Sequence, residues 1–204
     1  PPRSTLFPYT TLFRSQNGWH FIHPNFRGPN SRPEALGSEL AVEDIASAVD
    51  YMKAAYQVDA DRIYLVGVSG GGHASLLMAG RRPETWAGVS AWCGISDIKR
   101  WHAENKEAKP PRGYYKHIES ACGGDPSTDA KAAAECARRS PLAYLKNAKG
   151  LNLDVNAGAH DGRKGSVPFS QSLYAFNEVA DGKDMIPPAD IEAYYASIDR
   201  KSVV

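Results

Sequence analysis

The pentapeptide around Ser69 is the part of this sequence whose residue types and spacing could do covalent chemistry. Gly67, Ser69 and Gly71 occupy the fixed positions of the pattern G-x-S-x-G. An apolar, β-prone run precedes the pattern at 63–68, and small residues with helical character follow it at 72–80. A serine on a sharp turn between a strand and a helix presents its hydroxyl as a nucleophile, and we expect side chains at positions 67 and 71 to collide with the neighbouring strand and helix. The sequence therefore predicts Ser69 as a catalytic nucleophile.

Two phosphate-binding motifs with a similar glycine content do not fit this segment. A P-loop needs a lysine after its glycines, and none follows here. A dinucleotide-binding G-x-G-x-x-G has its second glycine where this chain has Ser69. Elsewhere, His20 and His23 fall on opposite faces of a predicted strand, so they do not converge on a metal ion. The sequence therefore predicts no cofactor and no metal.

A candidate acid for a catalytic triad lies in the loop after a later predicted strand. The apolar segment 151–157 runs into Gly158, and Asp161 follows shortly after it. In α/β-hydrolases the triad residues occur in the order Ser, then acid, then His, and the acid orients the histidine and stabilises its charged form. Asp161 fits that place, although aspartate between glycines is also a common turn former. Asp154 is the competing carboxylate, but it lies inside the predicted strand.

The general base of such a triad is missing from its usual position. A serine hydroxyl needs a base within hydrogen-bond reach to become a nucleophile. The chain has six histidines, and none of them follows Asp161. His73 is expected to pack or cap within the elbow helix, and His160 precedes the acid. We therefore expect the parent gene to have been cut at about residue 198, before its triad histidine.

The two ends of the chain differ from the rest. Residues 1–15 resemble the in-frame translation of a sequencing adapter, and residues 199–204 resemble the translation of its reverse complement. Such segments are excluded from fold reasoning. We therefore predict a native segment of 16–198 that forms a partial catalytic domain truncated at both ends. Because the true N-terminus is then missing, the compartment is undetermined, cytoplasmic or exported.

Charge and hydropathy exclude two classes of partner. The chain has 24 Lys and Arg against 23 Asp and Glu, without the clustered basic face that nucleic-acid binding requires. No segment approaches the roughly 20 apolar residues needed to cross a bilayer. We therefore predict no nucleic-acid partner and no membrane span, and the sequence leaves the oligomeric state open.

Predicted strands alternate with predicted helices along the chain. Apolar runs predict strands at 19–24, 63–68, 86–92 and 151–157. Helical periodicity predicts helices at 38–57, 72–80 and 168–180, the last with Phe169, Leu173, Phe176 and Val179 on one face. The segment 98–140 is expected to be an irregular insertion with short helices, a candidate cap over the site. This alternation is typical of a mostly parallel sheet with helices on both faces, and with the Ser69 pattern it predicts an α/β-hydrolase fold.

The three cysteines allow two interpretations. Cys93 lies in an apolar run and is expected to be an inert core thiol. Cys122 and Cys136 flank a Gly-, Pro- and Asp-containing loop, and they could form a disulfide if the protein is exported.

Taken in order, four stretches resemble the prolyl oligopeptidase family of serine peptidases. They are His-Pro-Asn-Phe-Arg-Gly at 23–28, Asp-Arg-Ile at 61–63, the Gly-rich elbow at 67–73, and Ser140-Pro141 leading to Gly-Ala-His-Asp at 158–161 and Val-Pro at 167–168. By resemblance, Ser69 is the nucleophile, Asp161 is the triad acid, and the Gly70 N–H is one donor of the oxyanion hole. Family members often place a second donor, a tyrosine, shortly after the Arg-Gly pair. This chain has no tyrosine there, and Asn30 is the candidate substitute.

The resemblance implies a serine hydrolase that cleaves peptide bonds through an acyl-enzyme. A carboxylesterase on the same fold is an alternative, because the fold and the elbow do not decide which acyl group is cleaved. A non-catalytic relative that binds a ligand through the old cleft is an alternative of another class. The expected substrate is a peptide or a small ester, and the chain as written is expected to have little activity because it lacks the base.

Overall fold

The computed structural model describes residues 18–197 and contains a parallel sheet of three strands in the order β1-β2-β3. The strands are β1 (Tyr64–Val68), β2 (Gly88–Trp92) and β3 (Leu153–Asn156). Val66 pairs with Ser90, and Ser90 pairs with Asp154, so the three strands end at the same edge of the sheet. The strands predicted at 63–68, 86–92 and 151–157 are confirmed.

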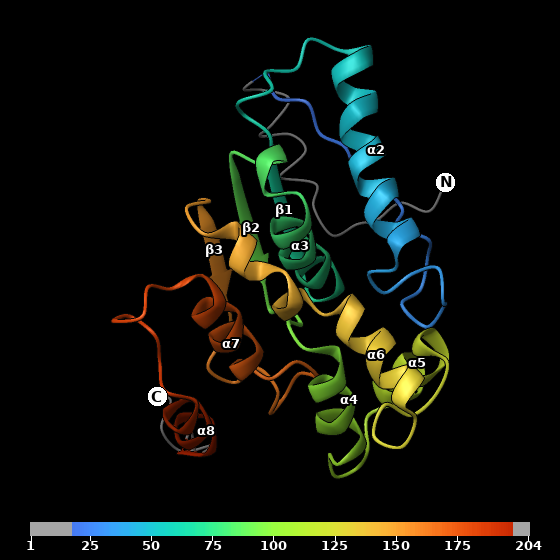
Figure 1. Cartoon of the computed structure of the whole chain (residues 1–204), viewed down its shortest axis with the longest axis vertical. Coiled ribbons are helices and arrows are strands. Elements are labelled where there is room, and N and C mark those ends of the chain that lie inside the picture. Colours follow the sequence, from blue (N-terminus) through green and yellow to red (C-terminus); the bar gives the residue numbers. More distant parts are fainter. Residues whose placement is uncertain (1–17, 198–204) are drawn as a thin grey trace.

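Helix α3 (Gly70–Arg81) lies against the sheet and forms the centre of the main core (Figure 1). Leu76, Leu77 and Met78 are almost completely buried, because α3 packs on β1 and β2 on one side and contacts further elements on the other. A helix surrounded in this way can be apolar on all sides rather than amphipathic. The helix predicted at 72–80 is confirmed, and it extends two residues further at its N-terminal end and one residue further at its C-terminal end.

Helix α2 (Glu39–Ala55) carries the amphipathic pattern predicted for 38–57. Ser38 caps its N-terminus by accepting a hydrogen bond from the Ala41 N–H at 3.2 Å. Val42, Ile45 and Val49 are buried and belong to the same core cluster as α3. The helix is therefore held by one apolar stripe and an ordinary polar cap.

The strand predicted at 19–24 is not present. Residues 19–24 are extended but pair with no strand of the described sheet, and most of their side chains are exposed. Trp19 instead stacks on Tyr64 of β1, with ring centroids 5.9 Å apart. An apolar run becomes a strand only when a neighbour supplies its hydrogen bonds, so the prediction was wrong here. The segments 1–15 and 199–204 that the sequence sets apart lie outside the described residues.

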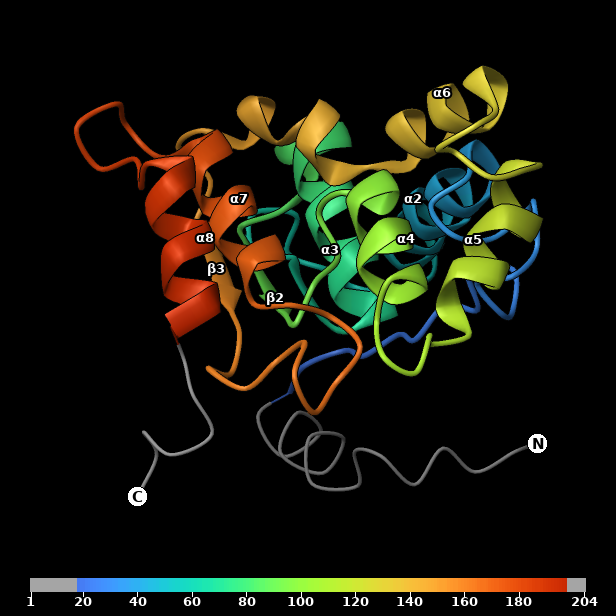
Figure 2. The same ribbon diagram turned by 90° about the horizontal axis from the view of Figure 1, so that it is seen from below.

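The segment 98–140 is more regular than expected. It forms α4 (Ile98–Lys106), α5 (Tyr114–Cys122) and α6 (Ala130–Arg139), which lie together beside one end of α2 (Figure 2). Asp97 caps α4 and Asp129 caps α6 through hydrogen bonds to backbone N–H groups. These three helices build a second small core around Ile118 and Trp101.

Helix α7 (Ser170–Val179) confirms the helix predicted at 168–180 and packs with α8 (Pro188–Ser197), but the apolar residues predicted to share one face are not equally buried. Phe169 is buried, but Phe176 is 38% exposed. Gln171 is buried instead, and its side-chain oxygen accepts hydrogen bonds from the Ser96 N–H at 3.0 Å and the Asp97 N–H at 2.9 Å. A buried amide with satisfied partners ties α7 to the loop after β2.

Short 3₁₀ turns complete the described elements: Pro83–Thr85, Pro141–Ala143 and Leu145–Ala148. The turn Pro141–Ala143 has its proline in the first turn, where the missing N–H costs no intrahelical hydrogen bond. Within residues 18–197, every helix is too short or too polar to cross a bilayer.

Candidate active site

Ser69 lies on a strained turn between β1 and α3. Its backbone has φ 55° and ψ −116°, a region that residues with a side chain rarely adopt. Such a conformation costs of order 1–3 kcal/mol and persists only when the surroundings enforce it. The Ser69 N–H donates to the Trp92 carbonyl oxygen at 2.8 Å, and the His73 N–H donates to the Ser69 carbonyl oxygen at 2.8 Å. These bonds fix the backbone and leave the side chain exposed at the edge of the sheet.

The glycines around Ser69 have different reasons to be there. A Cβ on Gly67 would lie 2.1 Å from the Gly71 carbonyl oxygen, so the expected collision at position 67 is confirmed. The expectation for Gly71 was wrong, because a Cβ there would meet nothing within 4 Å. Gly72 is the other constrained position, since its Cβ would lie 2.6 Å from the Trp92 carbonyl oxygen. The backbone of Gly71, rather than its missing side chain, is what crosses over β1.

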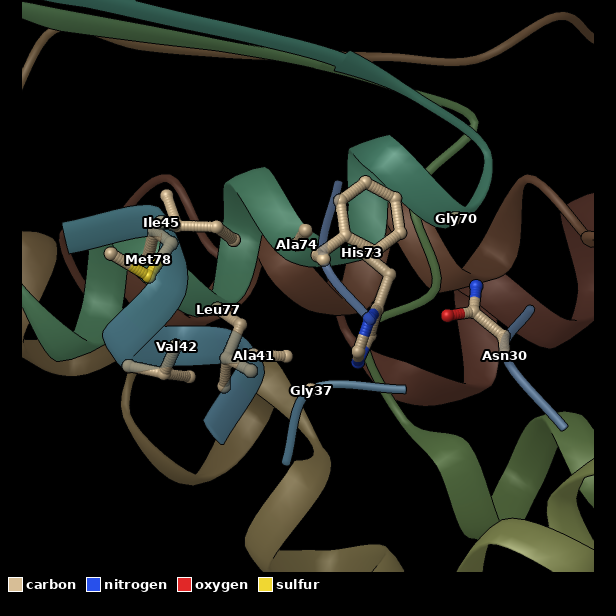
Figure 3. Close-up of a pocket in the computed structure, with 11 residues that line it drawn as sticks. Asn30, Gly37, Ala41, Val42, Ile45, Gly70, His73, Ala74, Leu77 and Met78 are labelled. Carbon is tan, nitrogen blue, oxygen red and sulfur yellow. The ribbon is translucent and has the colours of Figure 1, made fainter. Parts of the chain in front are cut away.

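The Gly70 N–H and the Asn30 side chain lie next to each other beside the elbow. Gly70 begins α3, and N–H groups in the first turn of a helix have no partner within the helix. A Cβ on Gly70 would lie 2.6 Å from Asn30 Nδ2, which shows how closely the Asn30 side-chain amide approaches the Gly70 backbone. The Asn30 Oδ1 accepts from the Leu36 N–H at 3.2 Å, and its Nδ2 is directed toward Gly70 (Figure 3). The arrangement offers two N–H donors, one from each residue.

The loop that carries Asn30 is held from a distance by Arg139 of α6. The Arg139 side chain is 4% exposed. It donates to the Pro33 and Ala35 carbonyl oxygens, each at 2.7 Å. Its positive charge is balanced by Glu135, whose carboxylate accepts from Arg139 Nε at 2.7 Å. Sequence reasoning missed this residue, because its partners lie about a hundred positions earlier in the chain.

Asp161 lies in the loop after β3, and one oxygen of its carboxylate is fixed by two donors. Asp161 Oδ2 accepts from the Gly158 N–H at 2.8 Å and from Cys93 Sγ at 2.9 Å. Oδ1 accepts no hydrogen bond among the described residues, so it is available to a further donor. Asp154 has its side chain exposed on β3 itself, as its position within the strand predicts.

Cys93 is not the inert core thiol that the sequence suggests. It follows β2 directly, is partly exposed, and has φ 49°. Burial and the hydrogen bond to the Asp161 carboxylate raise the pKa of the thiol to about 11, so it remains a proton donor at neutral pH. The position after a strand next to the elbow strand could have indicated this role, but only if the strand order were known.

Helix α4 and the loop between α4 and α5 support the loop that carries Asp161. Arg112 donates to the Gly162 carbonyl oxygen at 2.8 Å. The Trp101 indole N–H donates to the Ser166 carbonyl oxygen at 2.8 Å. Gly162 has φ 85°, and a Cβ there would lie 2.4 Å from Pro168 Cα, so the loop turns tightly at this glycine. The 98–140 segment therefore supports the loop that carries Asp161.

Strand order brings these residues to one edge. Ser69, Cys93 and Asp161 follow β1, β2 and β3 respectively, and parallel strands point their carboxyl ends in one direction. Sites in open parallel sheets form at this edge. The arrangement contains a candidate nucleophile, a carboxylate with one free oxygen, and a pair of N–H donors.

All six histidines fall within residues 18–197, and none of their imidazole rings hydrogen-bonds to the side chain of Ser69 or Asp161. His73 is buried and its Nε2 donates to the Arg139 carbonyl oxygen at 2.9 Å, so it packs as expected but against a remote segment. Burial lowers the pKa of His73 to about 4. His102 instead contacts Glu119 at 3.0 Å. The described residues therefore contain a candidate nucleophile and a candidate acid, and no imidazole hydrogen-bonds to the side chain of either.

One cluster has the residue types of a metal site. His102, Glu119 and Asp125 have ligand atoms that lie within 4.8 Å of one another. The Lys106 ammonium contacts the Asp125 carboxylate and lies 3.7 Å from Glu119 Oε1. Because this cation already neutralises the carboxylates, the cluster is explained as an ion-pair network.

The two best-defined cavities differ in size and position. A gap of about 10 Å³ lies beneath the Asn30 loop and is lined mainly by α2 and α3 (Figure 3). This gap is too small to hold more than one water. A larger open cavity of about 410 Å³ lies beside the end of β3, between Gly158, Phe169 and Tyr194. Of the two, only the larger could admit part of a ligand.

Comparison with known proteins agrees with the geometry. The model of the prolyl oligopeptidase family matches residues 7–190. Acylamino-acid-releasing enzyme 1 of Oryza sativa subsp. japonica is 23% identical to this chain, over 89% of the chain and 26% of that relative. The chain therefore spans about a quarter of the length of this relative.

Proposed function

The chain belongs to the prolyl oligopeptidase family, whose members have the α/β-hydrolase fold, and from this premise we propose that it carries the nucleophile and the acid of a serine peptidase. The family and the relative support serine hydrolase activity in general. The finer assignment rests on one observation: Ser69 is held at φ 55° on the elbow, and Asp161 follows the strand two places along at the same sheet edge. That arrangement suits acyl transfer.

In the proposed mechanism, Ser69 Oγ attacks the carbonyl carbon of the scissile bond while a histidine removes its proton. Negative charge then develops on the carbonyl oxygen, and the Gly70 N–H and Asn30 Nδ2 donate hydrogen bonds to it. The histidine returns the proton to the leaving amine, an acyl-enzyme remains on Ser69, and water releases the acyl group by the same steps. Asp161 Oδ1 accepts the hydrogen bond that orients the histidine.

The general base is proposed to be a histidine that lies outside these 204 residues. Two observations support this. Among residues 18–197, which include all six histidines, no imidazole ring hydrogen-bonds to the side chain of Ser69 or Asp161. Asp161 Oδ1 is left without a donor, although Oδ2 is held by Cys93 and Gly158. The carboxylate is thus positioned for a partner that the described residues do not provide.

The proposed substrate is a peptide, and because the relative is named an acylamino-acid-releasing enzyme, an acylated amino acid is the candidate product. An N-acetylated alanyl p-nitroanilide, the same anilide with a free amino terminus, and a p-nitrophenyl ester would separate the options. Hydrolysis of the acetylated anilide supports the peptidase. Hydrolysis of the ester alone would point to a carboxylesterase on the same fold.

The test uses a fluorophosphonate probe, which labels only an activated serine. The gene should first be sequenced past codon 198, and the product that includes the downstream segment should be labelled beside the 204-residue chain. We expect the longer product to label and Ser69→Ala to abolish the signal, while Ser127→Ala, at an exposed serine, retains it. Asp161→Asn should slow labelling by about 10²–10⁴-fold, and the exposed Asp154→Asn should not.

Two results would contradict the assignment. Labelling that persists in Ser69→Ala would exclude this serine as the nucleophile. A complete gene without a downstream histidine, together with absent labelling, would favour the non-catalytic binding relative instead.

A further inference from the structure

Two of the three cysteines lie together in the second core. Cys122 is the last residue of α5, and Cys136 lies in α6. Both belong to the apolar cluster of the helical segment, with 6% and 0% of their surface exposed. Both are free thiols in this structure. Two buried thiols in one small cluster are a modification site that the proposed mechanism does not use.

The backbone brings these two thiols toward each other. Ala132, Cys136 and Arg139 form the buried face of α6, at spacings of four and three residues. Helix α5 ends at Gly123 with φ 84°, and Gly124 with φ 157° then turns the chain back. A Cβ on Gly124 would lie 3.6 Å from Ala132 Cβ, one helical turn before Cys136. The turn therefore places the end of α5 directly against the face of α6 that carries Cys136.

Electrostatics agrees with direct contact between the sulfurs. The interaction with the other thiol is the largest influence on each of them: it lowers the pKa of Cys122 and raises that of Cys136. In addition, within residues 18–197 neither Sγ hydrogen-bonds to a side chain other than the partner cysteine, unlike Cys93, which donates to Asp161. The two thiols are thus close enough for each to influence the ionisation of the other.

We propose that Cys122 and Cys136 form a disulfide by exchange with a small-molecule disulfide such as oxidised glutathione, which closes the segment 123–135 and fastens α5 to α6. The Cys122 thiolate attacks one sulfur of glutathione disulfide, forms a mixed disulfide and releases one glutathione thiolate. Cys136 then loses its proton and attacks the Cys122 sulfur, which releases the second glutathione. The protein loses two protons and two electrons, and the small disulfide gains the electrons.

The crosslink would act on the candidate site through α6. Arg139 lies on the same face as Cys136, and its guanidinium holds the Pro33 and Ala35 carbonyl oxygens of the loop that carries Asn30. The disulfide closes residues 123–135 into a covalent loop, which limits how far α6 can move from α5 when the helical segment 98–140 partly unfolds. The disulfide would therefore stabilise the Asn30 loop as well as the helical segment 98–140. This proposal does not depend on the proposed peptidase function.

The experiment measures how strongly the fold favours this bond. The full 204-residue chain is equilibrated with mixtures of reduced and oxidised glutathione, with and without denaturing urea, trapped with an alkylating reagent, and mapped by mass spectrometry without reduction. Cys93→Ser leaves only the proposed pair, and Cys122→Ser leaves Cys93 and Cys136 as a mismatched control. The unsubstituted chain gives the same readout, so the result does not depend on a variant that folds.

We expect a Cys122–Cys136 linked peptide, with an effective thiol concentration at least about tenfold higher in the folded chain than in urea. The oxidised chain should also melt several degrees higher than the reduced chain. An effective concentration equal to or lower than that in urea would overturn the proposal, as would crosslinks that involve Cys93 or a persistent mixed disulfide at Cys122. In those cases the two thiols serve only as small apolar side chains of the core.

Discussion

At the scale of single residues, surroundings decide what a side chain can do. His73 and Cys93 both lie close in sequence to strand ends near the elbow, yet neither is available as a general base. His73 donates Nε2 to a backbone carbonyl oxygen and is buried, while Cys93 donates to the Asp161 carboxylate. Each side chain donates a hydrogen bond to another group, so neither can accept the proton of Ser69.

The buried His73 should make stability depend on pH. Its pKa falls from 6.5 to about 4 on folding. Below pH 6.5 the unfolded chain takes up a proton that the folded chain does not, so stability is lost as the pH falls from about 6.5 to about 4 and changes no further below that. The loss should approach about 3 kcal/mol.

Urea unfolding at several pH values would measure this effect. His73→Gln keeps an N–H donor for the Arg139 carbonyl oxygen and removes the titration, so it should flatten the curve across this window. His117→Gln, at an exposed histidine, serves as the matched control. A wild-type curve that matches the His73→Gln curve would refute the explanation.

At the scale of elements, the strand–turn–helix unit requires a glycine at position 67, where two backbone segments approach closely, but not at position 71. Gly67→Ala would force a Cβ to 2.1 Å from the Gly71 carbonyl oxygen. We expect it to destabilise the fold by about 3 kcal/mol or more, since backbone cannot move aside cheaply. Gly71→Ala meets open space in the first turn of α3 and should change stability by less than about 1 kcal/mol.

The two variants form a matched pair for the same measurement, the free energy of unfolding in urea. Far-ultraviolet circular dichroism should show that Gly71→Ala keeps its helix content. Equal losses in the two variants would mean that the glycines of the motif are required for another reason than the approach of β1 and α3.

At the scale of the whole molecule, one face of β1 is uncovered. Tyr64, Val66 and Val68 alternate along the strand and are 50–68% exposed, and Trp92 at the end of β2 is 48% exposed. Helix α3 covers the opposite face. A contiguous apolar surface of this kind promotes association in water.

We therefore expect the 204-residue chain to self-associate through this face. Val66→Lys, at a position that is 68% exposed, should shift light-scattering mass toward the monomer without lowering the melting temperature. Ser120→Lys adds the same charge at an exposed site on α5, a helix that packs on α4 and α6, and should leave association unchanged. If both variants reduce association equally, net charge rather than the apolar face is responsible.

The sequence by itself determined the features whose causes are local. The elbow, the α2 helix with its Ser38 cap, the strands at β1 to β3 and the loop position of Asp161 all follow from short-range patterns of apolar residues, caps and turn formers. The chain order of Ser69 and Asp161, and the absence of a later histidine, are likewise properties of the sequence. Whether residues 16–198 form the native segment stays a prediction.

Only the tertiary structure decided the features that depend on distant partners. The segment 19–24, predicted as a strand, has no neighbouring strand to pair with. In α7, Gln171 is buried because its side-chain oxygen accepts hydrogen bonds from the Ser96 and Asp97 N–H groups. Cys93 reaches Asp161 because β2 lies between β1 and β3, an order that no local pattern encodes. Arg139 holds the Asn30 loop across about a hundred residues. The periodicity of apolar residues predicts which face of a helix or strand is apolar. Which other element packs against that face depends on tertiary contacts between residues far apart in the sequence.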